Sequence, residues 1–253
     1  MKRPVGTPPV LFISLSLFLI LSITGCAGTE KKVESALTLF NKASAYYEKE
    51  KYWKARETFQ QVRDNYPLSK YSTISELRIA DSYYNEGQYN EAVLHYEDFK
   101  KLHPTNPVIP HVIYQIGMAY FSQILSVDRD QTFTHKAAKE FKYLISTYPS
   151  GTQAVSAREK LDACKEKLSQ HEFYVGHFYF RTKKYRVALN RFNGLLRDFP
   201  KSSVTDKTYL YIGKTHLSLG DKEKAGDALT YLLRNYPDSE YRNEAQDLLT
   251  QIK

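Results

Sequence analysis

One spacing recurs five times along this chain and limits the folds that it can adopt. Each copy has an aromatic residue or histidine followed by proline, an alanine twelve residues before that proline, and a large apolar or aromatic residue eight before it. The prolines are Pro67, Pro104, Pro149, Pro200 and Pro237, and the alanines are Ala55, Ala92, Ala137, Ala188 and Ala225. Further upstream lies a small residue followed three places later by a ring; the small residues are Ala43, Ala80, Gly117, Gly176 and Gly213. A repeat of this length indicates stacked copies of one supersecondary unit.

The residue types suit pairs of helices. Small side chains let two helices approach closely, and proline ends a helix because it cannot donate the next backbone hydrogen bond. We expect the aromatic residues to fill the space between neighbouring repeats, which accounts for 21 Tyr and 13 Phe. The pattern resembles the tetratricopeptide repeat and covers most of residues 35–253. It predicts an all-α fold: an α-solenoid of five tetratricopeptide-type helix pairs plus a C-terminal capping helix.

Two departures from the regular spacing divide the chain. The third repeat carries extra residues around Ser126–Thr132, between its two helices. Before Gly176 the helical apolar spacing runs on without a breaker, which predicts one long helix from about Thr152 to Arg181. We therefore expect an N-terminal lobe over 35–150 (repeats one to three) and a C-terminal lobe over 151–253 (repeats four and five with the cap).

The first residues have the features of an export signal. Lys2 and Arg3 precede an apolar run, Val10–Ile23, that is too short to span a membrane. The sequence Ile23-Thr24-Gly25-Cys26 then resembles a bacterial lipobox. We predict a lipoprotein signal peptide over 1–25, covalent lipid on Cys26 and a linker over 26–34. Cys164 is then left without a partner, and its spacing from Leu161 and Leu168 predicts a buried thiol.

Composition and motifs argue against several functions. The net charge is +8, but the charges alternate in sign, as in Glu48–Lys51, which is typical of a solvated helix face and not of nucleic-acid binding. His171-Glu172 lacks the second histidine of a zinc protease helix, because position 175 is Val175. No phosphate-binding glycine loop or Gly-x-Ser-x-Gly motif occurs. We expect no catalytic residue, no metal and no cofactor other than the lipid on Cys26.

Solenoids bind partners along the surface formed by the first helix of each repeat. Positions three before and four after the small residue are apolar throughout, which suits an extended hydrophobic peptide. In the N-terminal lobe these predicted groove residues are Phe40, Tyr47, Leu77, Tyr84, Tyr114 and Phe121. The alternative reading is that they complete the core between repeats.

The lipobox followed by five such repeats resembles the BamD family, the lipoproteins of the outer-membrane β-barrel assembly machinery. The insert Val127–Thr132 and the segment Gly194–Pro200 carry the resemblance beyond generic tetratricopeptide proteins. It implies a location on the periplasmic face of the outer membrane, where Ala27 after Cys26 is consistent with such sorting. The implied partners are unfolded outer-membrane protein peptides at the N-terminal lobe, a periplasmic POTRA domain of a BamA-like barrel at the C-terminal lobe, and other lipoproteins of the complex.

The partner-binding candidates in the C-terminal lobe are Phe173, Phe180, Arg181 and Arg197. The resemblance implies that Arg197 faces the barrel protein; alternatively, Arg197 is a solvated cation beside Asp198. The rival functions are a pilus-assembly lipoprotein that binds a secretin, and a Tol-Pal or peptidoglycan factor. Proteins of the latter kind usually carry a coiled coil before the repeats, and no heptad segment separates Cys26 from Ser35.

Overall fold

The computed structural model describes residues 1–2, 6 and 34–252. The predicted signal peptide, apart from residues 1–2 and 6, and Cys26 with the first part of the linker lie outside this range. From Ala36 onward the chain forms one compact unit. Throughout the described residues this unit is helical, with no strand.

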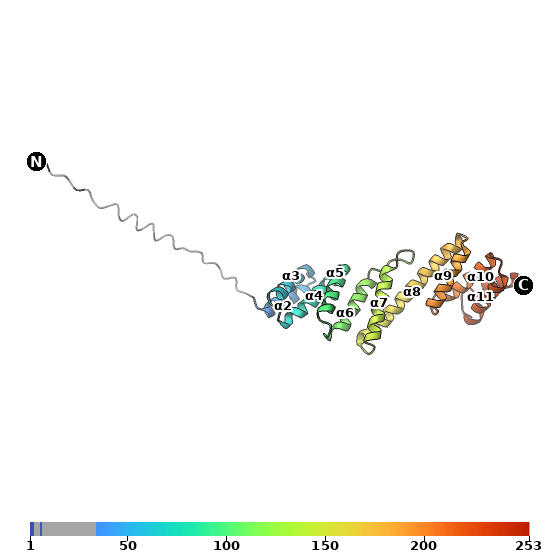
Figure 1. Cartoon of the computed structure of the whole chain (residues 1–253), viewed down its shortest axis with the longest axis horizontal. Helices are drawn as coiled ribbons and strands as arrows, with labels where there is room; N and C mark the ends of the chain where they lie inside the picture. Colours follow the sequence, from blue (N-terminus) through green and yellow to red (C-terminus); the bar gives the residue numbers. More distant parts are fainter. Residues whose placement is uncertain (3–5, 7–33, 253) are drawn as a thin grey trace. The chain divides into compact units, whose positions relative to one another are not determined.

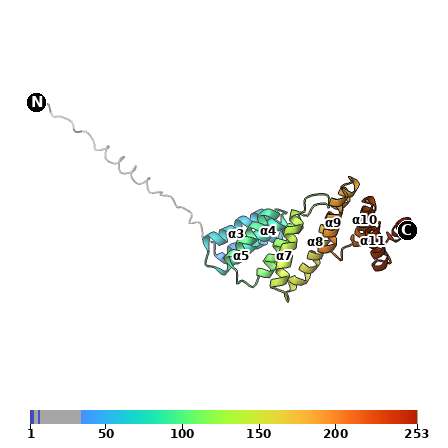
Figure 2. The same cartoon turned by 45° about the vertical axis from the view of Figure 1, so that its right-hand side comes forward.

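The helices occur as five successive pairs and a final single helix (Figure 1). The first helices of the pairs are α2 (Ala36–Glu48), α4 (Lys70–Asn85), α6 (Ile109–Phe121), α8 (Thr152–Arg181) and α10 (Thr205–Ser218). The second helices are α3 (Tyr52–Asn65), α5 (Tyr89–Leu102), α7 (Thr132–Thr147), α9 (Tyr185–Asp198) and α11 (Lys222–Asn235), and α12 (Arg242–Ile252) follows them. Each helix packs against its neighbours in the chain (Figure 2). The predicted all-α solenoid of five helix pairs with a C-terminal cap is confirmed.

Close packing inside each repeat explains why the small residues are small. A Cβ atom on Gly117 would lie 2.6 Å from the ring of Phe141, and one on Gly176 would lie 2.6 Å from the ring of Phe192. In both cases the ring belongs to the second helix of the same repeat. In the third and fourth repeats the residue eight before the proline therefore fills the space inside its own repeat, whereas we expected the aromatic residues to fill the space between repeats.

The turns within the repeats share a left-handed backbone residue. Gly87 and Gly220 have φ of 78° and 80°, as their predicted position in turns requires. Glu50 and Lys183 occupy the same place in the first and fourth repeats with φ of 55° and 59°. A residue with a Cβ atom at such a backbone φ angle costs about 1–2 kcal/mol, so these two turns are strained, whereas the two glycine turns are not.

The predicted long helix is present with the predicted bounds. α8 packs along α7 with its first part and along α9 with its later part (Figure 1). Its N-cap is Gly151, at the predicted start of the C-terminal lobe, and the division into lobes stays an interpretation. None of the described helices combines the length and the hydropathy that a membrane crossing needs.

The insert of the third repeat is an ordered loop between α6 and α7. Gln131 is buried, and its amide donates to the backbone oxygens of Ser126 and Arg129 at 2.9 and 3.0 Å. His171 of α8 bonds through Nδ1 to the backbone oxygen of Val127 at 2.6 Å. Because that oxygen only accepts, Nδ1 is the donor, and His171 ties the loop to α8.

Candidate functional site

A pocket of about 200 Å³ lies where the first helices of the second and third repeats meet. α4 and α6 supply most of its wall, and α2 and α5 supply one tyrosine each. Its lining residues are Tyr47, Arg78, Asp81, Tyr84, Asn85, Tyr96, His111 and Gln115. The structure thus brings two of the predicted groove residues, Tyr47 and Tyr84, to one site. We call this site the α4–α6 pocket.

A buried carboxylate forms the floor of the α4–α6 pocket. Asp81 is 7% exposed; its Oδ1 accepts a hydrogen bond from the Tyr96 hydroxyl at 2.7 Å, and its Oδ2 accepts one from Arg78 Nη1 at 3.2 Å. Burial raises the pKa of Asp81, and these two bonds oppose that rise because they favour the charged form. Burial also raises the pKa of Tyr96, so its hydroxyl keeps its proton and remains a donor.

Two tyrosines stand at the rim. The hydroxyl of Tyr47 accepts a hydrogen bond from Asn85 Nδ2 at 2.5 Å, and the Arg78 guanidinium lies 5.4 Å from the Tyr47 ring centre. Burial and the nearby Asp81 raise the pKa of Tyr47, which keeps this hydroxyl neutral. Tyr84 packs edge-on against Tyr89 at 5.5 Å. The α4–α6 pocket therefore offers a guanidinium, amides and neutral hydroxyls, which can hydrogen-bond a peptide backbone or a carboxylate.

The other predicted groove residues lie deeper in the molecule. Phe40 packs against Phe59 and Tyr71, with ring centres 5.6 and 5.2 Å away. The rest are partly buried against the core of the second and third repeats, namely Leu77, Tyr114 and Phe121. For these four residues a contact with a peptide stays a prediction.

Sequence reasoning missed the polar lining. Arg78 and Gln115 lie two residues before the small residue of their repeat, Asp81 lies one after it, and Asn85 lies five after it. The prediction used only the positions three before and four after. One signal was present in the sequence: Tyr96 carries a hydroxyl where the other repeats have Phe59, Phe141, Phe192 and Leu229.

The C-terminal candidates separate into two places. Phe173 and Phe180 both pack edge-on against Tyr211 of α10, with ring centres 5.4 and 5.3 Å away. Arg181 is the last residue of α8 and is exposed. Arg197 lies on α9, at a separate pocket of about 270 Å³ that is also lined by Glu172 of α8.

Arg197 makes a two-pronged ion pair with the adjacent Asp198. Its Nε and Nη2 donate to the two carboxylate oxygens at 2.8 and 3.0 Å, and its side chain is 77% exposed. The pairing raises the pKa of Arg197 and lowers the pKa of Asp198. The side chain is free on its outer face, so a partner can reach it without unfolding of α9.

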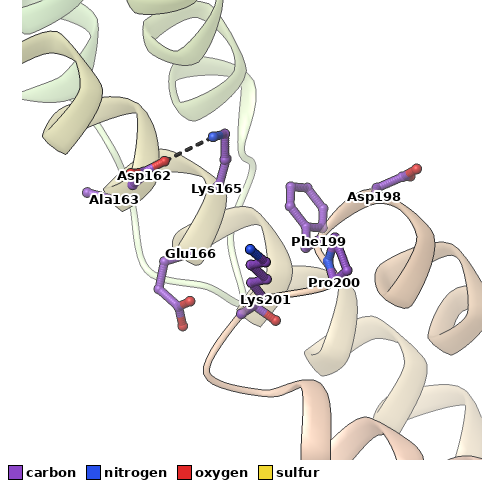
Figure 3. A pocket seen from close by; sticks show the side chains of 9 residues that line it. Asp162, Ala163, Lys165, Glu166, Asp198, Phe199, Pro200 and Lys201 are labelled. Atoms are coloured by element: carbon purple, nitrogen blue, oxygen red, sulfur yellow. Dashed lines mark hydrogen bonds and ion pairs between the residues drawn. The ribbon is translucent and has the colours of Figure 1, made fainter.

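A larger pocket of about 680 Å³ lies between α8 and the turn that follows α9. Figure 3 shows Asp162, Lys165 and Glu166 along α8, with Phe199 and Lys201 of the turn across from them. Lys165 pairs with Asp162 at 2.9 Å. Nothing in the repeat pattern pointed to this pocket, because α8 is longer than the first helix of a regular repeat.

Glu166 closes one side of the larger pocket by holding the next segment of chain. Its carboxylate accepts from the Ser203 backbone at 3.1 Å, from the Ser203 hydroxyl, and from Gln170 at 2.8 Å. Burial favours the neutral form of Glu166, but these bonds outweigh it and hold the pKa below its ordinary value. This contact fastens the start of the fifth repeat to α8.

Among the described residues, no three His, Cys, Asp or Glu side chains lie close enough together to hold a metal ion. Cys164 is fully buried, and burial raises the pKa of its thiol to about 11. As predicted, Cys164 packs as a small apolar side chain in the core of repeats two and three.

The paired helices and the pocket on their first helices define a tetratricopeptide-type scaffold, a class of protein that presents extended binding surfaces. The model of the YfiO family, described as an outer membrane lipoprotein, matches residues 32–230. The chain belongs to this family.

Curated relatives carry the name outer membrane protein assembly factor BamD. The Caulobacter vibrioides protein is 27% identical over 234 residues, covering 90% of this chain and 77% of the relative. The Rickettsia prowazekii protein is 27% identical over 240 residues, covering 94% of this chain and 96% of the relative. Among solved structures, the TPR2AB-domain:pHSP90 complex of yeast Sti1 is 13% identical, covering 86% of this chain and 82% of that one, with a TM-score of 0.45. The resemblance to the BamD family is confirmed.

Proposed function

We propose that this protein is a non-enzymatic scaffold and receptor in the assembly and insertion of β-barrel proteins into the outer membrane. The family match and the shared name of its relatives support this role. They favour it over the pilus and Tol-Pal alternatives. The role needs no catalytic residue and no cofactor beyond the lipid.

The proposal includes a lipid anchor on Cys26 that holds the repeats at the periplasmic face of the outer membrane. The lipobox and the description of the family support this location. Replacement of the cysteine, Cys26→Ala, should abolish labelling of the protein by radioactive palmitate. Continued labelling would show that lipid is attached elsewhere or that the anchor is of another kind.

The α4–α6 pocket carries the receptor part of the proposal. Its guanidinium and neutral hydroxyls lie between the first helices of two repeats, the surface on which solenoids bind extended chains. We assign this pocket to extended segments of unfolded outer-membrane proteins. The rim tyrosines Tyr47 and Tyr84 supply apolar area, and Arg78 supplies hydrogen bonds that fix the position of the bound chain.

The partner side of the proposal rests on the C-terminal candidates. Arg197 is exposed and presents a guanidinium, the group best suited to interface ion pairs with carboxylates. We assign Arg197, with Phe173, Phe180 and Arg181, to contact with a periplasmic POTRA domain of a BamA-like barrel protein. Other lipoproteins of the complex complete the list of proposed partners.

A pull-down from membranes in mild detergent, with partners identified by mass spectrometry, tests this function. The proposal predicts recovery of a large barrel protein with periplasmic POTRA domains. The exchange Arg197→Ala should reduce that recovery, whereas Arg234→Ala, on α11, should leave it unchanged. Recovery of a secretin or of Tol-Pal proteins without such a barrel would overturn the proposal.

A further inference from the structure

A row of cations and rings runs along the first helices of the fourth and fifth repeats. α8 contributes Phe173, His177 and Arg181, and α10 contributes Lys207, Tyr211 and Lys214. We call these six residues the α8–α10 surface; Phe173 is only 8% exposed and forms its base. None of them lines the α4–α6 pocket or the pocket beside Arg197.

The rings of the α8–α10 surface hold one another in place. His177 and Phe173 both stand edge-on to Tyr211, at 4.9 and 5.4 Å and at angles of 85° and 83°. Lys207 Nζ lies 4.9 Å from the Phe173 ring centre, and Lys214 Nζ lies 4.9 Å from that of Tyr211. The two ammonium groups are therefore fixed over aromatic faces instead of moving freely in solvent.

The charge on this surface is positive. Burial lowers the pKa of His177, and so do three neighbouring cations: Arg181, Lys207 and Lys214. Lys214 pairs with Glu244 of α12. Within residues 34–252, by contrast, neither Arg181 nor Lys207 has a carboxylate within the 4.0 Å of an ion pair. The surface is thus a row of aromatic rings beside two cations without an ion-pair partner among the described residues, Arg181 and Lys207, and one cation, Lys214, that is paired.

We propose that the α8–α10 surface binds an extended acidic segment of a partner protein, whose carboxylates pair with Arg181 and Lys207 and whose aromatic side chains pack on His177 and Tyr211. Charge complementarity selects this occupant. Lys214 already pairs with Glu244, so the cations left for a partner are Arg181 at the end of α8 and Lys207 on α10.

An anionic membrane is the competing occupant, and the geometry disfavours it. The side chain of Lys214 is 23% exposed, and Lys207 is also partly buried. A flat bilayer attracts cations that protrude from a protein. Arg181 is exposed, but Lys207, set among rings between two helices, is reached more easily by a narrow peptide chain.

This inference deepens the proposed function, because Phe173 and Arg181 are also assigned there to the barrel protein; its test needs neither the barrel protein nor the α4–α6 pocket. Fluorescence anisotropy with the full-length lipoprotein in mild non-ionic detergent tests it directly. The probe is a short fluorescein-labelled peptide of repeated Asp-Asp-Tyr triplets, with an Asn-Asn-Tyr peptide as its uncharged match. We expect the acidic peptide to bind at least about tenfold more tightly than its match, and the difference to shrink as sodium chloride is added.

The matched variants locate the binding. The double exchange Arg181→Gln/Lys207→Gln should weaken the acidic peptide about tenfold. The double exchange Lys142→Gln/Lys222→Gln removes the same charge from exposed sites on α7 and α11 and should change the affinity less than about twofold. Equal losses in the two variants, or no binding of the acidic peptide, would overturn the proposal. Binding of dihexanoyl-phosphatidylglycerol that only Arg181→Gln/Lys207→Gln abolishes, without peptide binding, would assign the surface to lipid instead.

Discussion

Asp81 and His177 occupy the same position in two repeats, one residue after the small residue of the first helix. In the second repeat, Tyr96 and Arg78 bond to Asp81, so its charge is satisfied inside the protein. In the fourth repeat, Phe192 occupies the position equivalent to Tyr96 and has no hydroxyl. The neighbours of His177 are aromatic rings and cations.

The comparison shows how one scaffold makes two kinds of surface. In the second repeat, Arg78 on the first helix neutralises Asp81 and the Tyr96 hydroxyl on the second helix adds a hydrogen bond, whereas Phe192 offers His177 no such bond. The α4–α6 pocket is therefore internally balanced and suited to a peptide backbone, whereas the α8–α10 surface leaves positive charge for a partner.

The largest expected loss of folding stability comes from removing the Asp81 carboxylate. Asp81→Ala leaves the buried Tyr96 hydroxyl without its acceptor and Arg78 without its pair, which should cost about 3 kcal/mol. His177→Ala at the matching position should cost less than about 1 kcal/mol, because His177 is partly exposed. Urea unfolding followed by circular dichroism measures both. Equal losses would mean that Asp81 is not the centre of a buried network.

A second difference concerns the small residues themselves. The second repeat has Ala80 where the fourth has Gly176, whose Cβ would meet the Phe192 ring at 2.6 Å. Gly176→Ala should therefore destabilise the fold by about 2 kcal/mol through overpacking. The control Gly194→Ala, in mid-helix on α9 with no atom nearer than 4.0 Å, should be neutral or stabilising by up to about 1 kcal/mol. Thermal unfolding of the two variants would contradict this account if both gained stability.

The repeat pattern predicted the fold, because the fold depends on small residues, rings and prolines at fixed spacing, and the unbroken apolar spacing before Gly176 predicted the bounds of α8. It did not predict the Asp81–Tyr96 bond, which joins residues fifteen apart on two helices. The larger pocket beside Phe199 was also missed, since it depends on where the turn after α9 lies against α8. Packing positions recur in every repeat and can be recognised from the sequence, whereas polar contacts occur once and need coordinates.

Removing the Tyr96 hydroxyl alone should cause a smaller loss of folding stability. Tyr96→Phe gives the second repeat the ring of the fourth and should cost about 1 kcal/mol, the value of one hydrogen bond to a buried acceptor. Tyr143→Phe on the exposed face of α7 serves as the control and should change stability by less than about 0.5 kcal/mol. A loss no larger than that of the control would show that the Asp81 carboxylate is satisfied without Tyr96.

The smallest expected effects are on the pH dependence of folding stability, which should have opposite signs at Asp81 and His177. The pKa of Asp81 is raised in the folded protein. Its contribution to the unfolding free energy is therefore fully present below the pKa of an unfolded aspartate and is lost as pH rises through the pKa of the folded state. The pKa of His177 is lowered in the folded protein. Its contribution to the unfolding free energy is therefore present above the pKa of an unfolded histidine and is lost as pH falls through the pKa of the folded state.

Unfolding free energies of the wild type measured against Asp81→Asn and His177→Gln isolate these two terms. Relative to Asp81→Asn, the wild type should gain stability from neutral pH down to the unfolded pKa of an aspartate. Relative to His177→Gln, it should lose stability as pH falls through the range in which histidine titrates. Differences of the same sign for both variants would contradict the assigned causes.

The central claim is that the α4–α6 pocket receives unfolded outer-membrane proteins, and direct binding tests it best. Fluorescently labelled peptides tiled across a β-barrel protein would be titrated with the wild type and with Tyr47→Ala/Tyr84→Ala, with helicity checked by circular dichroism. The account predicts peptides that bind the wild type and bind the double variant at least about tenfold more weakly, while Tyr143→Ala binds normally. Unchanged affinity in a fully helical double variant would contradict it.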